Sequence, residues 1–369
     1  MIALAASANT GVTNKIGFPG LGLEFNINET AISDCLGIKG FNIQWYGIIL
    51  AIGICLAFLL FYNLAVKKEE IDPDTVYNVA LITVPLAIIG ARLFYVVSEW
   101  DSYAGRSFLD IINIRNGGIA IYGAIIFGLA SVLIYSKIKK FSPFSILDAL
   151  APAVMLGQAI GRWGNFVNAE AYGWSEGVDK LPWRMVLDYY VIDKVKNPEG
   201  VTSVHPTFLY ESLWNVVGLV IILAFIYRKK KFNGQIFFSY MGWYGLGRAF
   251  IEMIRADSLR IPGTSLKLSV CIGIACVISS IIGLIVLSKR HKEEVLEMSE
   301  YKSAFSTIAA AINKESDSLA ESVYDTDYDE TEDDREEELE ESNDEPEEET
   351  QETEISEEIE ETEKDGIEE

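Results

Sequence analysis

Residues 146–173 read ILDALAPAVMLGQAIGRWGNFVNAEAYG, and the two halves of this stretch differ in character. Residues 146–160 are mostly apolar, although Asp148 and Pro152 interrupt them. The second half then gathers a guanidinium, two carboxamides and a carboxylate, from Arg162, Asn165, Asn168 and Glu170. Such a density of polar groups directly after an apolar run is hard to explain by packing alone.

Six further apolar runs approach or reach the roughly 20 residues that a helix needs to cross a bilayer. They comprise residues 45–66, 79–97, 119–135, 206–227, 236–254 and 268–287. Clusters of lysine and arginine close four of them, near positions 67, 137, 228 and 289. Because such clusters stay in the cytoplasm, the chain must cross the membrane an even number of times between neighbouring clusters. Residues 146–160 must therefore cross as well.

This pattern predicts an all-α polytopic membrane protein with seven transmembrane helices in residues 41–292. The N-terminus then lies outside and the C-terminus in the cytoplasm. Residues 1–40 are expected to form an irregular or partly interfacial outer arm, and residues 161–204 an outer head loop. The aromatic residues of that loop fit either membrane-surface anchors or a lid over a lipid pocket.

The formal net charge of −24 is concentrated in the C-terminal region. Residues 315–369 hold 30 acidic and 2 basic residues, whereas the rest of the chain carries a net charge of +4. A segment this acidic and poor in apolar residues buries too little surface to offset ordering. Residues 293–369 are therefore expected to be a largely disordered cytoplasmic tail, with no catalytic role and an unknown partner.

Arg162 and Asn165 share a face if the helix continues to residue 165, and Gly161 and Gly164 leave room beside them. A guanidinium is a planar donor that suits phosphate oxygens, so a phospholipid headgroup is its expected partner. The alternative is an arginine that only marks a helix end by reaching to the interface.

A second group of polar residues falls inside the apolar run 236–254. Arg248 and Glu252 stand four residues apart, with Tyr244 one turn before and Arg255 one turn after. The pair fits either a functional site or an internal ion pair that neutralises itself and fixes helix packing.

Residues 161–173 resemble the signature of the prolipoprotein diacylglyceryl transferases. Three other segments resemble parts of the same family, in the same order, and the resemblance covers residues 41–290. They are QWYG at 44–47, HPTFLYE at 205–211, and Gly247-Arg248 with Glu252 and Arg255. The resemblance implies a bacterial inner-membrane enzyme that moves a diacylglyceryl group from phosphatidylglycerol to the lipobox cysteine thiol in the signal peptide of a prolipoprotein.

The resemblance also implies roles for individual residues. Arg162 and Arg248 would surround the phosphate, while Asn165, Glu170 and Glu252 position them. Further substrate-binding positions would be Asn168, Gly173, Tyr244 and Arg255. Possible proton handlers are Tyr46, Tyr122 and His205. Family members often carry histidine where this chain has Tyr122, and a phenol with a pKa of about 10 is a poor base at neutral pH.

Three glycines lie just before or near the start of the run 119–135. Gly117, Gly118 and Gly123 are expected to permit close approach of lipid, with Gly117 and Gly118 as substrate-binding positions, or alternatively to serve helix packing. His205 at the outer start of a helix fits a structural role as well as a catalytic one.

No metal-ligand spacing is present, and the reaction requires no metal or organic cofactor. The four cysteines, Cys35, Cys55, Cys271 and Cys276, show no paired spacing. No nucleic-acid partner is expected. Two other functional classes remain open: a transporter or channel lined by an Arg–Glu pair, although no two related halves are evident, and a scaffold whose acidic tail recruits partners.

Overall fold

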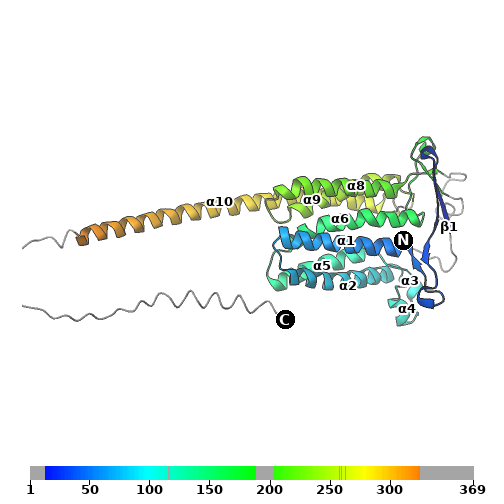
Figure 1. The fold of residues 1–369 in the computed structure, drawn as a ribbon, viewed down its shortest axis with the longest axis horizontal. Helices are drawn as coiled ribbons and strands as arrows, with labels where there is room; N and C mark the ends of the chain where they lie inside the picture. The colour runs from blue at the N-terminus through cyan, green and yellow to red at the C-terminus, as the bar shows by residue number, and fades with distance from the viewer. Residues whose placement is uncertain are drawn as a thin grey trace, which may run out of the picture. The chain divides into compact units, whose positions relative to one another are not determined.

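The computed structural model describes residues 13–114, 117–187, 203–256, 258, 260–261 and 263–324, and side chains up to residue 316. The chain divides into two compact units, residues 1–300 and residues 301–369. Helices dominate the first unit, and they run side by side in Figure 1.

Six described helices are long and apolar enough to cross a membrane. They are α1 (Trp45–Lys68), α2 (Pro73–Ser98), α5 (Ile121–Lys139), α6 (Pro143–Val167), α8 (Thr207–Ile221, continuing to Lys229) and α10 (Leu268–Tyr324). The predicted multi-pass helical membrane protein is therefore confirmed. Two short helices, α3 (Trp100–Tyr103) and α4 (Phe108–Ile112), follow α2.

Helix α9 (Gln235–Ile254) is not among those six. It contains Arg248 and Glu252 and many glycine and aromatic residues, which lower its apolar character. It nevertheless lies beside α8 in the bundle (Figure 1), where Trp214 and Trp243 stack with ring centroids 4.5 Å apart. The count of seven transmembrane helices remains a prediction.

Helix α6 lies at the centre of the bundle and packs against α1, α8 and α9. Pro143 starts the helix, where its missing N–H is not needed. Asp148, interrupting the apolar run, is fully buried and accepts hydrogen bonds from the backbone N–H groups of Gly234 (2.7 Å) and Phe237 (2.8 Å). Its carboxylate therefore caps the start of α9.

Lys230 joins three segments at this end of the bundle. Its ammonium pairs with Asp148 at 2.8 Å and with Glu69, which also accepts a hydrogen bond from the Tyr227 hydroxyl at 2.6 Å. The α1–α2 turn, the start of α6 and the α8–α9 turn thus meet at one end. This is the arrangement that the basic clusters predict for the cytoplasmic side.

The opposite end of the bundle carries a small antiparallel sheet with strand order β2-β1-β5-β6 (Figure 1). Its strands are β1 (Thr13–Phe18), β2 (Leu23–Asn28), β5 (Met185–Leu187) and β6 (Ser203–Val204). Strands β3 (Thr30–Ile32) and β4 (Ile43–Gln44) form a second pair. The irregular conformation expected for residues 1–40 is therefore wrong at β1, β2 and β3, and residues 1–12 lie outside the described part of the chain. Ile16 and Phe18 point to the same side of β1 and are buried in one apolar cluster with Phe166. This burial orders the arm.

The C-terminal expectation also needs correction. Disorder does not begin at residue 293, because α10 continues to Tyr324. Elongating a helix that is already formed avoids the cost of nucleation, and residues 293–314 are rich in Glu, Lys and Ala. Residues 325–369 lie outside the described part of the chain.

Helices α2 and α5 approach each other closely at two glycines. A Cβ atom at Gly123 would lie 2.1 Å from the carbonyl oxygen of Gly90, and one at Gly90 would lie 2.4 Å from the Phe127 ring. The contact requires glycine at both positions. This geometry favours the helix-packing interpretation of Gly123.

We predict that Gly123→Ala destabilises the protein by about 1–3 kcal/mol, because the added methyl group must push the two backbones apart. Gly128→Ala on the same helix is the matched control, since a Cβ there would meet its nearest neighbour at an ordinary 3.7 Å. Thermal unfolding in detergent measures both variants. Equal unfolding temperatures for the two would contradict the packing geometry.

Candidate functional site

Glu211 on α8 is the centre of the polar cluster. Its carboxylate is buried and is shared by three guanidinium groups. Oε2 lies 2.6 Å from Arg162 Nη2 and 3.4 Å from Arg248 Nη1, and Oε1 lies 3.2 Å from Arg255 Nη1. Residues from α6, α8 and the α9 end thus meet on one carboxylate.

Glu252 supplies a second buried carboxylate on the same side. It lies 2.8 Å from Arg248 Nη2 and 3.8 Å from Arg255 Nε. Arg248 also donates to the Ser269 hydroxyl at 3.3 Å. Around these two carboxylates there are three guanidinium groups, which leaves an excess of positive charge that suits an anionic ligand. The side chain of Arg162 is partly exposed, so a ligand can reach it.

A chain of amides connects Arg162 to Glu170. Arg162 Nη1 donates to Asn165 Oδ1 at 3.3 Å, and Asn165 Nδ2 donates to Glu170 Oε1 at 2.9 Å. Asn168 Nδ2 reaches the same oxygen at 3.5 Å. The residues on either side of Glu170, Ala169 (φ 49°) and Ala171 (φ 58°), adopt left-handed backbone, which is unfavourable for alanine and concentrates at functional sites.

Two tyrosines lie next to this cluster. Tyr46 on α1 is within electrostatic range of Arg162 and Glu170. Tyr244 on α9 is likewise within range of Arg162, Arg248 and Glu211. A Cβ at Gly164 would lie 2.7 Å from the Tyr46 ring, so this glycine admits Tyr46 against α6.

His205 belongs to a neighbouring polar cluster. Its ring nitrogens lie 2.7 Å from the Ser175 hydroxyl and 3.3 Å from the Tyr210 hydroxyl, which also accepts from Trp183 Nε1 at 2.8 Å. Burial lowers the pKa of His205, so the imidazole is neutral at pH 7.

Gly173 connects the two clusters through its backbone. It exchanges backbone hydrogen bonds with His205 at 3.1 and 2.7 Å and bridges to Arg255. A Cβ at Gly173 would lie 2.9 Å from the carbonyl oxygen of Ile254, so glycine is required for this close approach. The described contacts of Gly173 are therefore structural.

The described contacts of Tyr122, Gly117 and Gly118 are with residues outside the arginine cluster. The described ring contact of Tyr122 is with Phe94, at a centroid distance of 6.4 Å. The carbonyls of Gly117 and Gly118 accept hydrogen bonds from Arg92 at 3.1 and 2.8 Å, and both glycines have positive φ. No described contact joins these three residues to Arg162 or Arg248.

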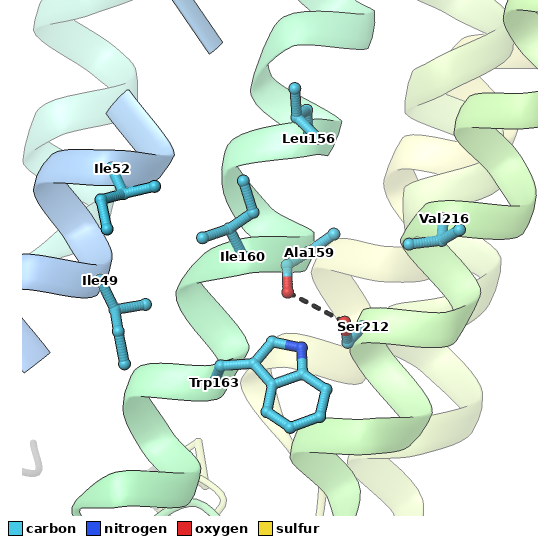
Figure 2. A pocket seen from close by; sticks show the side chains of 8 residues that line it. All are labelled: Ile49, Ile52, Leu156, Ala159, Ile160, Trp163, Ser212 and Val216. Atoms are coloured by element: carbon cyan, nitrogen blue, oxygen red, sulfur yellow. Dashed lines mark hydrogen bonds between the residues drawn. The ribbon is translucent and has the colours of Figure 1, made fainter. Parts of the chain in front are cut away.

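An apolar groove of about 290 Å³ lies between α1, α6 and α8 (Figure 2). Trp163, next to Arg162, and Ser212, next to Glu211, face it together with Ile49 and Ile52 of α1. The Ser212 hydroxyl donates to the carbonyl of Ala159 at 2.9 Å, which leaves the lining mostly aliphatic and aromatic.

Sequence reasoning undervalued Glu211 and missed Arg92. Glu211 stood in the resemblance only as part of the segment at 205–211, although a carboxylate inside an apolar run is itself a signal. Arg92 lies in the run 79–97 and is buried, and its guanidinium donates to four backbone carbonyls between residues 110 and 118. Its charge was the signal that pointed to it.

The lowered pKa of His205 predicts a pH dependence of stability. As pH falls below about 6.5, the unfolded state takes up the proton first, so stability falls until the folded pKa is reached. His205→Asn should therefore lose less stability than the parent between pH 8 and pH 5.5. His291→Asn, at the only other histidine, should retain the parental pH dependence. Thermal unfolding at both pH values measures this, and parallel behaviour of the two variants would contradict it.

Comparison with known proteins identifies the family. The sequence profile of the prolipoprotein diacylglyceryl transferases matches residues 34–286. A phosphatidylglycerol–prolipoprotein diacylglyceryl transferase of Finegoldia magna is 40% identical over 263 residues, which cover 71% of this chain and 97% of that protein. Proteins of the same description from Clostridium kluyveri (46% identical over 227 residues; 61% and 85%) and Clostridioides difficile (40% over 258 residues; 70% and 96%) are also similar. The chain therefore belongs to the prolipoprotein diacylglyceryl transferase family.

Proposed function

We propose that Arg162 and Arg248 bind the phosphate of phosphatidylglycerol during diacylglyceryl transfer. The activity follows from the family: the chain is a membrane enzyme that transfers a diacylglyceryl group from phosphatidylglycerol to a prolipoprotein, and the similarity does not favour a transporter. The observation that carries the proposal is the approach of both guanidinium groups to Glu211 Oε2.

The chemistry requires such a charge. The sulfur of the acceptor cysteine attacks the glycerol carbon that bears the phosphodiester, so a carbon–sulfur bond forms while a carbon–oxygen bond breaks. The electron pair leaves with the phosphate oxygen, and glycerol phosphate is released. Fixed donors in a low-dielectric site stabilise this developing negative charge most effectively. In the resting cluster Glu211 and Glu252 hold the guanidinium groups in place.

The thiol proton needs an acceptor because a thiol with a pKa of about 8.5 is mostly protonated at pH 7. Among the candidates, His205 can accept a proton at pH 7 because its imidazole is buried and neutral, although its described side-chain contacts are with Ser175 and Tyr210 and not with the arginine cluster. Tyr46 lies beside the arginine cluster and can orient the lipid. Tyr122 has no described contact with the cluster.

The apolar groove beside Trp163 supports a site for the acyl chains. Its mostly aliphatic lining suits lipid tails. Two of its lining residues, Trp163 and Ser212, directly follow Arg162 and Glu211 in the sequence. A lipid with its tails in this groove and its phosphate at Arg162 would present the glycerol between the two. The orientation with this end outside, in a bacterial inner membrane, follows from the basic clusters and from the family resemblance.

The test combines purified protein in detergent, phosphatidylglycerol and a lipobox peptide. We expect glycerol phosphate in solution and, by mass spectrometry, a peptide that gains one diacylglyceryl group on its cysteine. A serine in place of that cysteine is the control peptide and should remain unmodified. Glycerol phosphate release without peptide modification would overturn the proposed acceptor chemistry.

We predict that Arg162→Lys keeps the charge but loses the two-pronged donor, so kcat should fall by about 10²-fold, as when a fixed donor to a developing anion is removed. Arg184→Lys is the matched control, because Arg184 donates only to the Leu181 carbonyl among the described contacts. It should transfer normally. Turnover by Arg162→Lys near the parental rate would remove the phosphate role of Arg162.

A separate prediction concerns the base. Tyr122→Phe keeps the ring that contacts Phe94, and it should transfer at close to the parental rate. Loss of a general base lowers the rate by about 10²–10⁴-fold, which is the result expected for His205→Asn. Rates measured across pH in the same assay distinguish the two. A large loss in Tyr122→Phe with a normal His205→Asn would reverse the assignment.

A further inference from the structure

Helix α10 carries an apolar stripe beyond the basic pair Lys289 and Arg290. Its residues are Met298, Tyr301, Phe305, Ile308 and Ile312, with exposed fractions between 55% and 68%. Exposure of so much apolar surface on one helix is unfavourable in water, and contiguous patches of this kind mark interaction sites. Family resemblance and family profile both end before this segment, so the diacylglyceryl transfer reaction gives no reason for the stripe.

The spacing of the stripe indicates a helical partner. Successive members are three, four, three and four residues apart, which is the alternation of a and d positions in a coiled coil. Met298, Phe305 and Ile312 then occupy a positions, and Tyr301 and Ile308 occupy d positions. Leu319 continues the a series in the sequence, whereas Glu315 takes the intervening d position.

A membrane surface is a poorer partner for this stripe. Helices that lie on anionic membranes carry lysine and arginine on their polar face. Residues 291–316 instead contain five glutamates and three lysines. Their net negative charge disfavours binding to anionic lipid.

We propose that residues 298–312 form a parallel coiled coil with the same segment of a second copy of this chain. Two copies inserted in one membrane in the same orientation present these segments in parallel, and each stripe starts eight residues after Arg290. In that register Glu297 at a g position faces Lys302 at the following e position of the other copy, and this occurs on both sides of the seam. The charges therefore complement each other in the self-pairing.

The acidic region limits how far the coiled coil extends toward the C-terminus. Glu315 falls at the next core position, and residues 315–369 carry a net charge of −28 on each copy. Repulsion between two such segments opposes pairing beyond Ile312. Truncation after residue 324 should therefore preserve or strengthen the association.

Disulfide cross-linking in membranes tests the proposal on the full chain. In a background with all four native cysteines replaced by serine, Tyr301→Cys and Ile308→Cys should cross-link to a dimer under mild oxidation. Ser303→Cys and Ala310→Cys are the matched controls, because positions 303 and 310 lie on the opposite face of the coil and should stay monomeric. Equal cross-linking at all four positions, or none at positions 301 and 308, would overturn the proposal.

A second measurement separates self-association from another partner. Phe305→Glu should abolish the cross-link at position 301, whereas Ala310→Glu should leave it intact. Diacylglyceryl transfer by each variant shows that the membrane unit is folded. A cross-linked band at position 301 that contains a different protein in place of a second copy would also contradict the proposal.

Discussion

The sharing of the Glu211 carboxylate by three guanidinium groups is the interaction on which the site depends. Arg162, Arg248 and Arg255 come from different parts of the chain, and each would be costly alone in an apolar environment. One buried carboxylate allows them to coexist within a few ångströms. It thereby fixes the relative position of α6, α8 and the end of α9.

This arrangement connects stability with chemistry. Glu211 and Glu252 orient the guanidinium groups. In the proposed reaction, little reorganisation is then needed when negative charge develops on the leaving phosphate. The amide chain from Arg162 to Glu170 adds a second constraint on the same arginine. The apolar groove lined by Trp163 and Ser212 is the proposed site for the lipid tails.

The sequence allowed prediction of the helices, because long apolar runs closed by basic clusters have few alternatives in a membrane. It also pointed to Arg162, in the polar stretch after one apolar run, and to Arg248, because a charged residue inside an apolar run needs a partner. The central place of Glu211 depends on contacts between residues that are 37 to 49 positions apart, which no local pattern encodes. The sheet of the N-terminal arm depends likewise on pairing of β1 with β5, far along the chain. Tyr122 was assigned to the site only because of its position in the family pattern, and its described ring contact is with Phe94.

The most direct test of the central claim is the rate of diacylglyceryl transfer by Glu211→Gln. Glutamine keeps the shape but removes the charge that holds three arginines together, and a misplaced binding group costs about 10²-fold in rate. We expect kcat/KM to fall by about this factor, while Glu176→Gln, at an exposed loop position, transfers at the parental rate. Transfer by Glu211→Gln at the rate of Glu176→Gln would contradict the account.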